Sequence, residues 1–350
     1  MHNLAIIGFG GMGSYHFSEL KKYGRVNVKG IFDINPQRCA FAKTLGAKVY
    51  SSADEIFSDV EVDLVLIATT NEVHKELAAQ ALKAGKHVLC EKPATLTSGE
   101  LEELIETANK HGKVFTIDQN RRTNPDFVLM RQKVEEGLLG DIYVIESRVE
   151  GSRGMPGGWR TVKELGGGMM LDWGVHLIDQ IMYMTGEKVV NVFCKMYHID
   201  YQDVDDNFRL TMTFEDGLTA HIEVSTNNYI THPRWYVLGK SGTLQIDDWD
   251  CGGKIVRCVD KENTWDEEIF YTKAGPTKTM APRNRDSVEE IGLSAPEPAG
   301  DLIPVYEQFL DAVEGKAELT IKPEECLRVM KVMEAAFLSA ESGEAVKADI

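Results

Sequence analysis

The first twenty residues carry the pattern that most restricts the fold of this chain, a glycine-rich loop between a strand and a helix. Residues 4–7 form a short apolar run typical of a buried strand, and a helical pattern begins at Ser14. In the spacing G-x-G-x-x-G, glycines let the backbone approach a pyrophosphate, and the N–H groups that open the helix bind it. The pattern predicts a dinucleotide site formed by Gly8, Phe9, Gly10, Gly11, Met12 and Gly13.

The end of the next predicted strand, 26–32, indicates which dinucleotide is bound. Asp33 follows this strand, twenty residues after Gly13. An acidic side chain there can accept hydrogen bonds from the adenosine ribose hydroxyls and repels a 2′-phosphate. Asp33 therefore favours NAD over NADP as the cofactor. Arg38 lies about one helical turn further on, where a guanidinium can accommodate a phosphate, so NADP stays open as the second choice.

Strands and helices continue to alternate as far as residue 117. We expect strands at 63–69, 86–90 and 113–117 and helices at 72–84 and 98–110, the second helix opened by Ser98 as its N-cap. Strict alternation predicts an α/β fold with a doubly wound parallel sheet of the Rossmann type, which binds ligands at the carboxyl ends of its strands.

Polar clusters follow three of these strands. We expect them to line the cofactor site through Thr69, Asn71, His74, Glu91, Lys92 and Asn120. Lys92 is the most informative of them, because Pro93 fixes its turn at the end of a hydrophobic strand. A lysine that is partly removed from water can exchange a proton with a substrate oxygen. The alternative interpretation is an ordinary loop lysine paired with Glu91.

A second glycine-rich segment, 166–168, precedes a predicted helix that carries a carboxylate and an imidazole. Asp172 and His176 are four residues apart, which would place them one turn apart on one helix face. Such a pair can tune a proton-transfer group near neutral pH. The same residues also allow a structural interpretation, with Asp172 as the N-cap and His176 as a core histidine.

The glycine-rich segment 150–160 is predicted to form a mobile loop over the active site. Arg153, Trp159 and Arg160 can supply hydrogen bonds and a flat face for a sugar ring, and Trp173 can do the same. The alternative is that these residues only anchor the loop to the sheet.

The pattern changes beyond about residue 123, where short strands follow one another. Alternating segments 208–214 and 218–225, joined by Glu215-Asp216-Gly217, predict a hairpin. Further strands are expected at 143–149, 189–194, 235–239, 243–246 and 254–259, a surface excursion at 271–298, and closing helices at 301–314 and 323–342. We therefore predict an NAD-binding domain over 1–122. A C-terminal α+β domain over 123–350 would contain a large, mainly antiparallel open sheet, with the last helix able to pack back on the first domain.

Composition limits the partners and the compartment. The net charge of −17 argues against nucleic acid and anionic membranes as partners. We find no signal peptide and no apolar run of the roughly 20 residues that span a bilayer. The six cysteines form no C-x-x-C pair, which favours a reducing cytoplasm over a disulfide framework or a zinc site. No metal is expected.

Taken together, the motifs resemble the Gfo/Idh/MocA oxidoreductases, the family of glucose-fructose oxidoreductase and inositol dehydrogenase. The matching segments run in order through the glycine loop 8–13, 68–71 with His74, 91–93, 120–122, and 166–168 leading to Asp172 and His176. The resemblance implies a catalytic set of Lys92, Asp172 and His176 around a secondary alcohol. It also implies a homodimer or homotetramer paired through the open face of the second sheet. Thr70 stands where relatives commonly have proline.

The resemblance implies reversible hydride transfer between NAD and a secondary ring alcohol of a sugar, cyclitol or glycoside, including oxidation of a glycoside at C3. His176 would accept the alcohol proton, Lys92 would bind the same oxygen, and Asp172 would hold the imidazole tautomer or bind a neighbouring hydroxyl. Two other classes stay open. One is a redox-neutral glycosidase or lyase that retains its NAD through oxidation, elimination and reduction. The other is a non-catalytic NAD-binding sensor.

Overall fold

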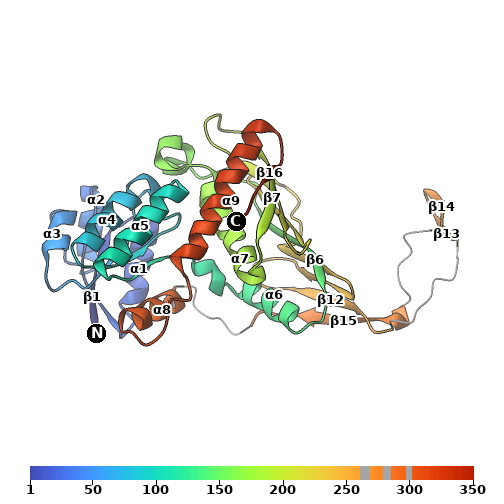
Figure 1. The fold of residues 1–350 in the computed structure, drawn as a ribbon, viewed down its shortest axis with the longest axis horizontal. Coiled ribbons are helices and arrows are strands. Elements are labelled where there is room, and N and C mark those ends of the chain that lie inside the picture. Colours follow the sequence, from blue (N-terminus) through green and yellow to red (C-terminus); the bar gives the residue numbers. More distant parts are fainter. Residues whose placement is uncertain (261–268, 279–284, 297–301) are drawn as a thin grey trace.

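The computed structural model describes residues 1–260, 269–278, 285–296 and 302–350, which form two large sheets with helices between them and one small hairpin (Figure 1). Within these ranges the first sheet has five strands in the order β2-β1-β3-β4-β5. They are β1 (His2–Ile7), β2 (Val26–Phe32), β3 (Leu64–Ile67), β4 (His87–Cys90) and β5 (Phe115–Ile117), and every described pairing among them is parallel. The strand order reverses between β1 and β3, where such sheets bind ligands.

The first sheet is parallel because its strands are apolar on both faces and helices cover both. All four residues of β3 are fully buried. The helices are α1 (Gly11–Leu20), α2 (Pro36–Thr44), α3 (Ala53–Ser58), α4 (His74–Lys83) and α5 (Ser98–His111). The prediction of Ser98 as N-cap is wrong by one residue. Thr97 caps α5 in a capping box with Glu100, and Ser98 instead bonds Glu334 of the last helix.

The second sheet confirms the predicted antiparallel architecture. Its described strands run in the order β15-β12-β11-β10-β6-β9-β8-β7-β16, and among their pairings only β6 with β9 is parallel. The predicted hairpin is β8 (Asn207–Phe214) with β9 (Thr219–Ser225). The others are β6 (Ile142–Glu150), β7 (Val189–Tyr197), β10 (Trp235–Gly239), β11 (Gly242–Ile246), β12 (Gly253–Cys258), β15 (Val288–Leu293) and β16 (Val346–Lys347).

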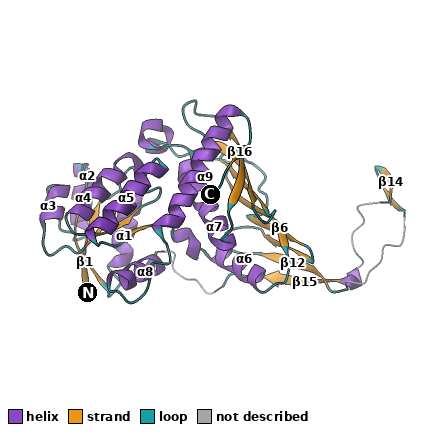
Figure 2. Cartoon of the chain, in the orientation of Figure 1, coloured by secondary structure: helices purple, strands orange, loops and turns teal. Residues whose placement is uncertain are grey.

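One face of this sheet is apolar and covered, whereas the other is open and carries both polar and apolar side chains. Phe208, Leu210 and Met212 of β8 are buried, and the alternate residues Arg209 and Thr211 point to the open face. Helices α6 (Pro125–Glu135), α7 (Val175–Thr185) and α9 (Pro323–Ser342) cover the apolar face, as Figure 2 shows. The open face therefore leaves apolar side chains such as Phe193 of β7, which is 44% exposed, in contact with water.

The predicted excursion 271–298 is wrong in part. It contains the small hairpin β13 (Phe270–Thr272) and β14 (Gly275–Thr277), but it also contains β15, which pairs with β12 at the sheet edge. The prolines that suggested an excursion lie outside that strand. Residues 279–284 and 297–298 of the excursion lie outside the described residues.

The last two helices return to the first domain. Helix α8 (Ile303–Val313) lies beside the first sheet, and α9 contacts α5 and β5 on one side and α7 and β7 on the other (Figure 1). This confirms the expectation that the last helix packs back. Arg25 holds α8 through Asp311, with the guanidinium nitrogen 2.7 Å from the carboxylate.

A buried arginine joins three parts of the fold. Arg122 lies in the turn Asn120–Thr123 that follows the first sheet, and its Nε and Nη2 donate to the two carboxylate oxygens of Asp179 on α7 at 2.8 and 2.7 Å. Its Nη1 donates to Glu325 of α9 at 2.6 Å. The side chains of Arg122 and Asp179 are 5% and 2% exposed. The pair therefore fixes α7 to the end of the first domain.

Removing one partner of this pair should destabilise the protein strongly. Arg122→Leu leaves the carboxylate of Asp179 buried without its cation, and losses of roughly 3–5 kcal/mol are typical of such changes. We expect the double variant Arg122→Leu/Asp179→Leu to recover part of this loss. The exposed pair of Arg131 with Glu135 provides the control, since Arg131→Leu should cost at most about 1 kcal/mol. Urea unfolding measures each value, and equal effects at Arg122 and Arg131 would contradict the argument.

Candidate active site

The glycine loop has the geometry that a dinucleotide requires. Gly8 has a φ of +94°, and a Cβ there would lie 2.3 Å from the carbonyl oxygen of Ala68. Gly10 precedes α1 without any side chain to cap it, and a Cβ on Gly11 would meet nothing within 4 Å. The N–H groups that open α1 therefore face open space, and the loop fits the pyrophosphate of NAD.

Asp33 lies at the end of β2 as predicted, but much of its carboxylate serves the loop itself. Its Oδ2 accepts from the backbone N–H of Phe9 at 2.7 Å, and its Oδ1 accepts from that of Asn35 at 2.7 Å. Arg38 lies beside it, with Nη1 3.5 Å from Oδ2. The guanidinium of Arg38 is half exposed and close to Gly10. Contact of Asp33 with a ribose stays a prediction.

The other predicted cofactor residues gather at the carboxyl ends of β3, β4 and β5, although two of them have structural contacts. Asn71 is buried and donates from its amide to the carbonyl oxygen of Gly166 at 2.9 Å. The ring of His74 lies between the carbonyl oxygens of Pro93 and Thr69, at 2.9 and 3.2 Å. Asn120 opens the turn that carries Arg122. The structure thus brings Asn71 and His74 to the site as parts of its frame.

The glycine segment 166–168 is required by close neighbours. Gly168 has a φ of +103°, and a Cβ there would lie 2.3 Å from the Oδ1 of Asp205. Asp205 also accepts from the N–H of Met170 at 2.7 Å, and burial raises its pKa to about 7. Asp205 was not predicted from the sequence, because it lies 33 residues beyond Asp172 in a loop without a recognisable motif.

Asp172 lies on an irregular turn of helix. Met170–Gly174 forms a π-helical turn, and α7 begins only at Val175. Asp172 and His176 lie four residues apart on one continuous helical stretch, Asp172 in its π-turn and His176 in the first turn of α7. The alternative that Asp172 caps the helix is wrong, because the N-cap of α7 is Gly174. Such π-turns are frequent at functional sites. Among the described contacts of Asp172, none reaches the imidazole of His176.

The carboxylate of Asp172 joins two cations from different parts of the chain. The Nζ of Lys92 donates to the Oδ1 of Asp172 at 3.0 Å and to its backbone carbonyl at 2.7 Å. The Nε of Arg160 donates to Oδ2 at 2.7 Å. Burial opposes ionisation of Asp172, but Lys92 and Arg160 outweigh it and lower the pKa of the carboxyl. The cluster crosses the boundary between the two domains.

His176 is buried on the first turn of α7, 4% exposed. Burial, together with the positive charges of Lys92, Arg121 and Arg234, holds the pKa of its imidazole well below the usual value. The imidazole is therefore neutral at pH 7 and can accept a proton. No described group lies within hydrogen-bonding distance of its Nδ1.

Aromatic rings and arginines surround this histidine. Trp173 meets the ring of His176 at 6.1 Å and that of Trp249 at 5.9 Å, measured between centroids. The guanidinium of Arg121 lies 4.2 Å from the centre of the Trp173 ring. Trp249 follows β11 in an acidic turn, and nothing in the sequence links it to the site. The structure thus adds Arg121, Trp249 and Arg234 to the predicted set.

The loop 150–160 contributes through its far end. Arg160 pairs with Asp172, and its guanidinium lies 4.6 Å from the ring centre of Trp159. Arg153 is exposed, and the structure does not bring it into contact with Lys92, Asp172 or His176. Arg160 is therefore part of the cluster, whereas a substrate role for Arg153 and Trp159 stays a prediction.

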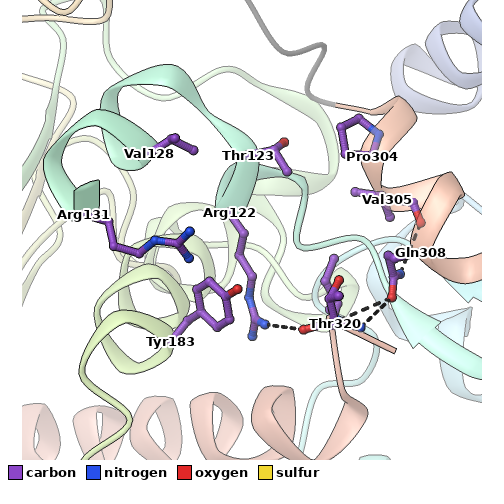
Figure 3. Close-up of a pocket in the computed structure, with 10 residues that line it drawn as sticks. Arg122, Thr123, Val128, Arg131, Tyr183, Pro304, Val305, Gln308 and Thr320 are labelled. Atoms are coloured by element: carbon purple, nitrogen blue, oxygen red, sulfur yellow. Dashed lines mark hydrogen bonds between the residues drawn. The ribbon is translucent and has the colours of Figure 1, made fainter. Parts of the chain in front are cut away.

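A separate cavity of about 330 Å³ lies behind the junction of Arg122, away from the cluster (Figure 3). Thr123, Val128, Tyr183 and Pro304 line it, and Arg131 points toward Tyr183. It contains none of Lys92, Asp172 and His176. We therefore place the candidate active site at the cluster of Lys92, Asp172 and His176, between the carboxyl end of β4 and the start of α7.

Known proteins share both halves of the chain. Residues 2–119 match an oxidoreductase family with an NAD-binding Rossmann fold, and residues 127–245 match the GFO/IDH/MocA C-terminal domain. The structure of an NAD-binding protein from Listeria innocua is 41% identical, with a TM-score of 0.94 and 99% of both chains covered.

Two characterised relatives are more distant. The D-glucoside 3-dehydrogenase of Escherichia coli is 31% identical over 321 residues, 89% of this chain and 87% of that protein. The scyllo-inositol 2-dehydrogenase (NADP(+)) IolW of Bacillus subtilis is 27% identical over 302 residues, 84% of this chain and 81% of that protein.

Fold and site together define an oxidoreductase, an NAD(P)-dependent dehydrogenase of CH–OH groups with a Rossmann domain. The chain belongs to the Gfo/Idh/MocA family. The resemblance found in its sequence is thereby confirmed. In the described part of the chain, no helix is long and apolar enough to cross a membrane.

Proposed function

We propose that this protein is an NAD-dependent dehydrogenase that oxidises a secondary ring alcohol of a sugar, cyclitol or glycoside. The observation that carries the proposal is the cluster of Lys92, Asp172 and Arg160 beside the neutral imidazole of His176. It lies where the cofactor domain meets the helix-covered sheet. Oxidation of an alcohol requires a base for its hydroxyl proton and a hydrogen-bond donor for its oxygen, and this junction contains both groups.

Each residue has a defined task in this mechanism. When NAD is bound, its nicotinamide ring would supply the acceptor for the hydride that leaves the carbinol carbon. His176 accepts the hydroxyl proton, because burial and nearby cations keep its imidazole neutral. Lys92 uses two donors on Asp172, which leaves its third N–H for the substrate oxygen. Asp172 holds Lys92 in place rather than orienting His176. A positive group at that oxygen stabilises the charge that develops as the proton leaves.

The wall of the site supports a polyol ring as substrate. Trp173 and Trp249 offer flat apolar faces, and Arg160 offers N–H donors for hydroxyl groups. The names of the two relatives, a glucoside and an inositol dehydrogenase, support the same class. Oxidation of a glycoside at C3 is the finer form of the proposal.

Replacing Lys92 or His176 should slow the chemical step. We expect Lys92→Ala and His176→Ala each to lower kcat by roughly 10²–10⁴-fold, the range typical of acid–base groups, with NAD binding nearly intact. Asp172→Asn should lower kcat less, because the amide can still accept from Lys92. In the Lys92 variant, Asp172 still has Arg160 as its ion-pair partner, so we expect the protein to fold. The measurement is NADH absorbance during a screen of sugars, inositols and glycosides.

The control for this test is Lys110→Ala, on an exposed part of α5, which should turn over like the unmodified protein. A Lys92 variant with near-normal turnover would show that the active site lies elsewhere. Product mass is followed alongside absorbance. If substrate is converted without net formation of NADH, the protein is a redox-neutral glycosidase or lyase rather than a dehydrogenase. If NAD binds and no substrate is turned over, the result favours the non-catalytic sensor.

We propose that NAD binds more tightly than NADP, because the carboxylate of Asp33 lies where a 2′-phosphate would approach. Titration of the protein with each cofactor measures the difference. Asp33→Ser should narrow it, and should also weaken NAD binding because the N–H groups of Phe9 and Asn35 lose their acceptor. Arg38→Ala is the matched control, since it should weaken NADP binding alone. Equal or tighter binding of NADP to the unmodified protein would contradict the proposal.

We also propose a homo-oligomer of two or four chains that pairs through the open face of the second sheet, in a cytoplasmic compartment. The open face carries no described helix, and all six cysteines are free thiols. The face carries polar and apolar side chains, so its pairing would combine hydrogen bonds with the burial of residues such as Phe193. Thr211→Arg on that face should reduce the mass measured by light scattering to one chain, whereas Glu106→Arg on α5 should not. A monomeric unmodified protein would refute the proposal.

A further inference from the structure

A fully buried histidine lies beneath the cofactor loop, outside the cluster described above. His16 is on α1 and is 0% exposed. Its Nδ1 is 2.8 Å from the hydroxyl of Tyr306 on α8. Its Nε2 is 2.9 Å from the Oε1 of Glu91 and 3.3 Å from the Oδ2 of Asp118. Glu91 and Asp118 follow β4 and β5, so three elements of the first domain and one returning helix meet at this ring.

The contacts of His16 define its charge. Two carboxylates that share one buried site cannot both ionise unless a cation accompanies them. Burial opposes a charge on His16, but Asp118 and Glu91 outweigh it and raise the pKa of the imidazole to about 9. The same contact lowers the pKa of Glu91 despite its burial. At neutral pH the centre therefore contains an imidazolium at His16 and an ionised carboxylate at Glu91.

The contacts of His16 allow a direct hydrogen bond to a carboxylate. Its Nε2 lies 2.9 Å from the Oε1 of Glu91, the distance of an N–H donor to a carboxylate oxygen. Burial lowers the pKa of the neighbouring His74, which faces backbone carbonyls only. The two buried histidines on either side of Glu91 thus differ in charge.

We propose that His16 is a positioning residue whose buried positive charge keeps Glu91 ionised at the end of β4, and that this carboxylate makes the site prefer oxidised over reduced nicotinamide. Glu91 is fixed on both sides, by His16 through Oε1 and by the backbone N–H of Lys92 through Oε2 at 3.3 Å. Its side chain is 8% exposed, so it acts through its charge rather than by contact.

The physical basis is the charge of the cofactor. The nicotinamide ring is positive when oxidised and neutral when reduced, so a nearby carboxylate stabilises only the oxidised form. A partly screened charge at such a site contributes on the order of 1.4 kcal/mol, which corresponds to a tenfold change in the ratio of dissociation constants. The other charged or titratable groups that face this pair are Lys92, His74, Cys90, Asp118 and Tyr306. Burial raises the pKa of Cys90 and of Tyr306 well above their usual values, so both stay neutral.

The test measures the dissociation constants of NAD+ and NADH by titration calorimetry. Glu91→Gln should shift their ratio toward NADH by about tenfold at every pH. His16→Gln should shift the ratio in the same direction but less at about pH 6, because Glu91 and Asp118 then share one proton and Glu91 loses only part of its charge. The preference should return as the pH rises above about 8. The unmodified protein should show a constant ratio over that range. The measurement uses only the cofactor, so it is independent of which alcohol is oxidised.

The matched control is His87→Gln at the opposite end of β4, since burial lowers the pKa of that histidine to about 4. It should leave the ratio unchanged. A ratio within twofold of the unmodified value for both Glu91→Gln and His16→Gln would overturn the proposal. If only Glu91→Gln changes the ratio of dissociation constants, His16 has no part in the preference. If His87→Gln changes the ratio as much as Glu91→Gln does, the change is not specific to Glu91. If His16→Gln does not fold, Glu91→Gln still decides the role of the carboxylate.

Thermal unfolding gives a second readout for His16. Its pKa is raised on folding, so its stabilising effect is complete below about pH 6.5 and is lost as the pH rises through about 9. The melting temperature of the unmodified protein should therefore fall over this range with release of up to one proton. His16→Gln should lack this component, and an identical pH dependence in both proteins would contradict a charged His16.

Discussion

The buried pair of Arg122 and Asp179 is the constraint on which the site depends. Arg122 lies in the turn that follows the first sheet, and Asp179 lies one turn after His176 on α7. Because both groups are buried, neither can leave the other without a large loss of solvation. The pair therefore sets where α7 stands relative to the first sheet. That position allows Lys92, which follows β4, to meet Asp172, which precedes α7, at 3.0 Å.

Much of the frame could be predicted from local sequence because each element is specified by its own residues. The apolar strands, the glycine loop and the hairpin around Gly217 all appear as expected. What failed depends on distant neighbours. No residue pattern near Met170 predicts a π-helical turn, because Asp205, which lies in another loop, stabilises that turn. The tie between Asp172 and Arg160 likewise appears only once the loop folds back, so sequence spacing suggested His176 as the partner instead.

The titratable groups of the site differ in protonation state because their neighbours differ. Lys92 and Arg160 lower the pKa of Asp172 although burial opposes them. Burial, together with the positive charges of Lys92, Arg121 and Arg234, keeps His176 neutral. On the other side of the glycine loop, His16 takes the opposite state because two carboxylates face it. Two histidines of one chain thus hold opposite protonation states at neutral pH. Their neighbours, and not the residue type, determine this difference.

The return of α8 and α9 has a consequence for how the chain is made. Tyr306, which completes the surroundings of His16, and Glu334, which holds the start of α5, belong to the last fifth of the sequence. A ribosome releases the first sheet long before it releases these residues. Domains generally form as they emerge, yet this one lacks part of its own interior until translation is nearly finished. A stop codon after β15 would therefore damage the nucleotide-binding half, although every residue of its five strands is present.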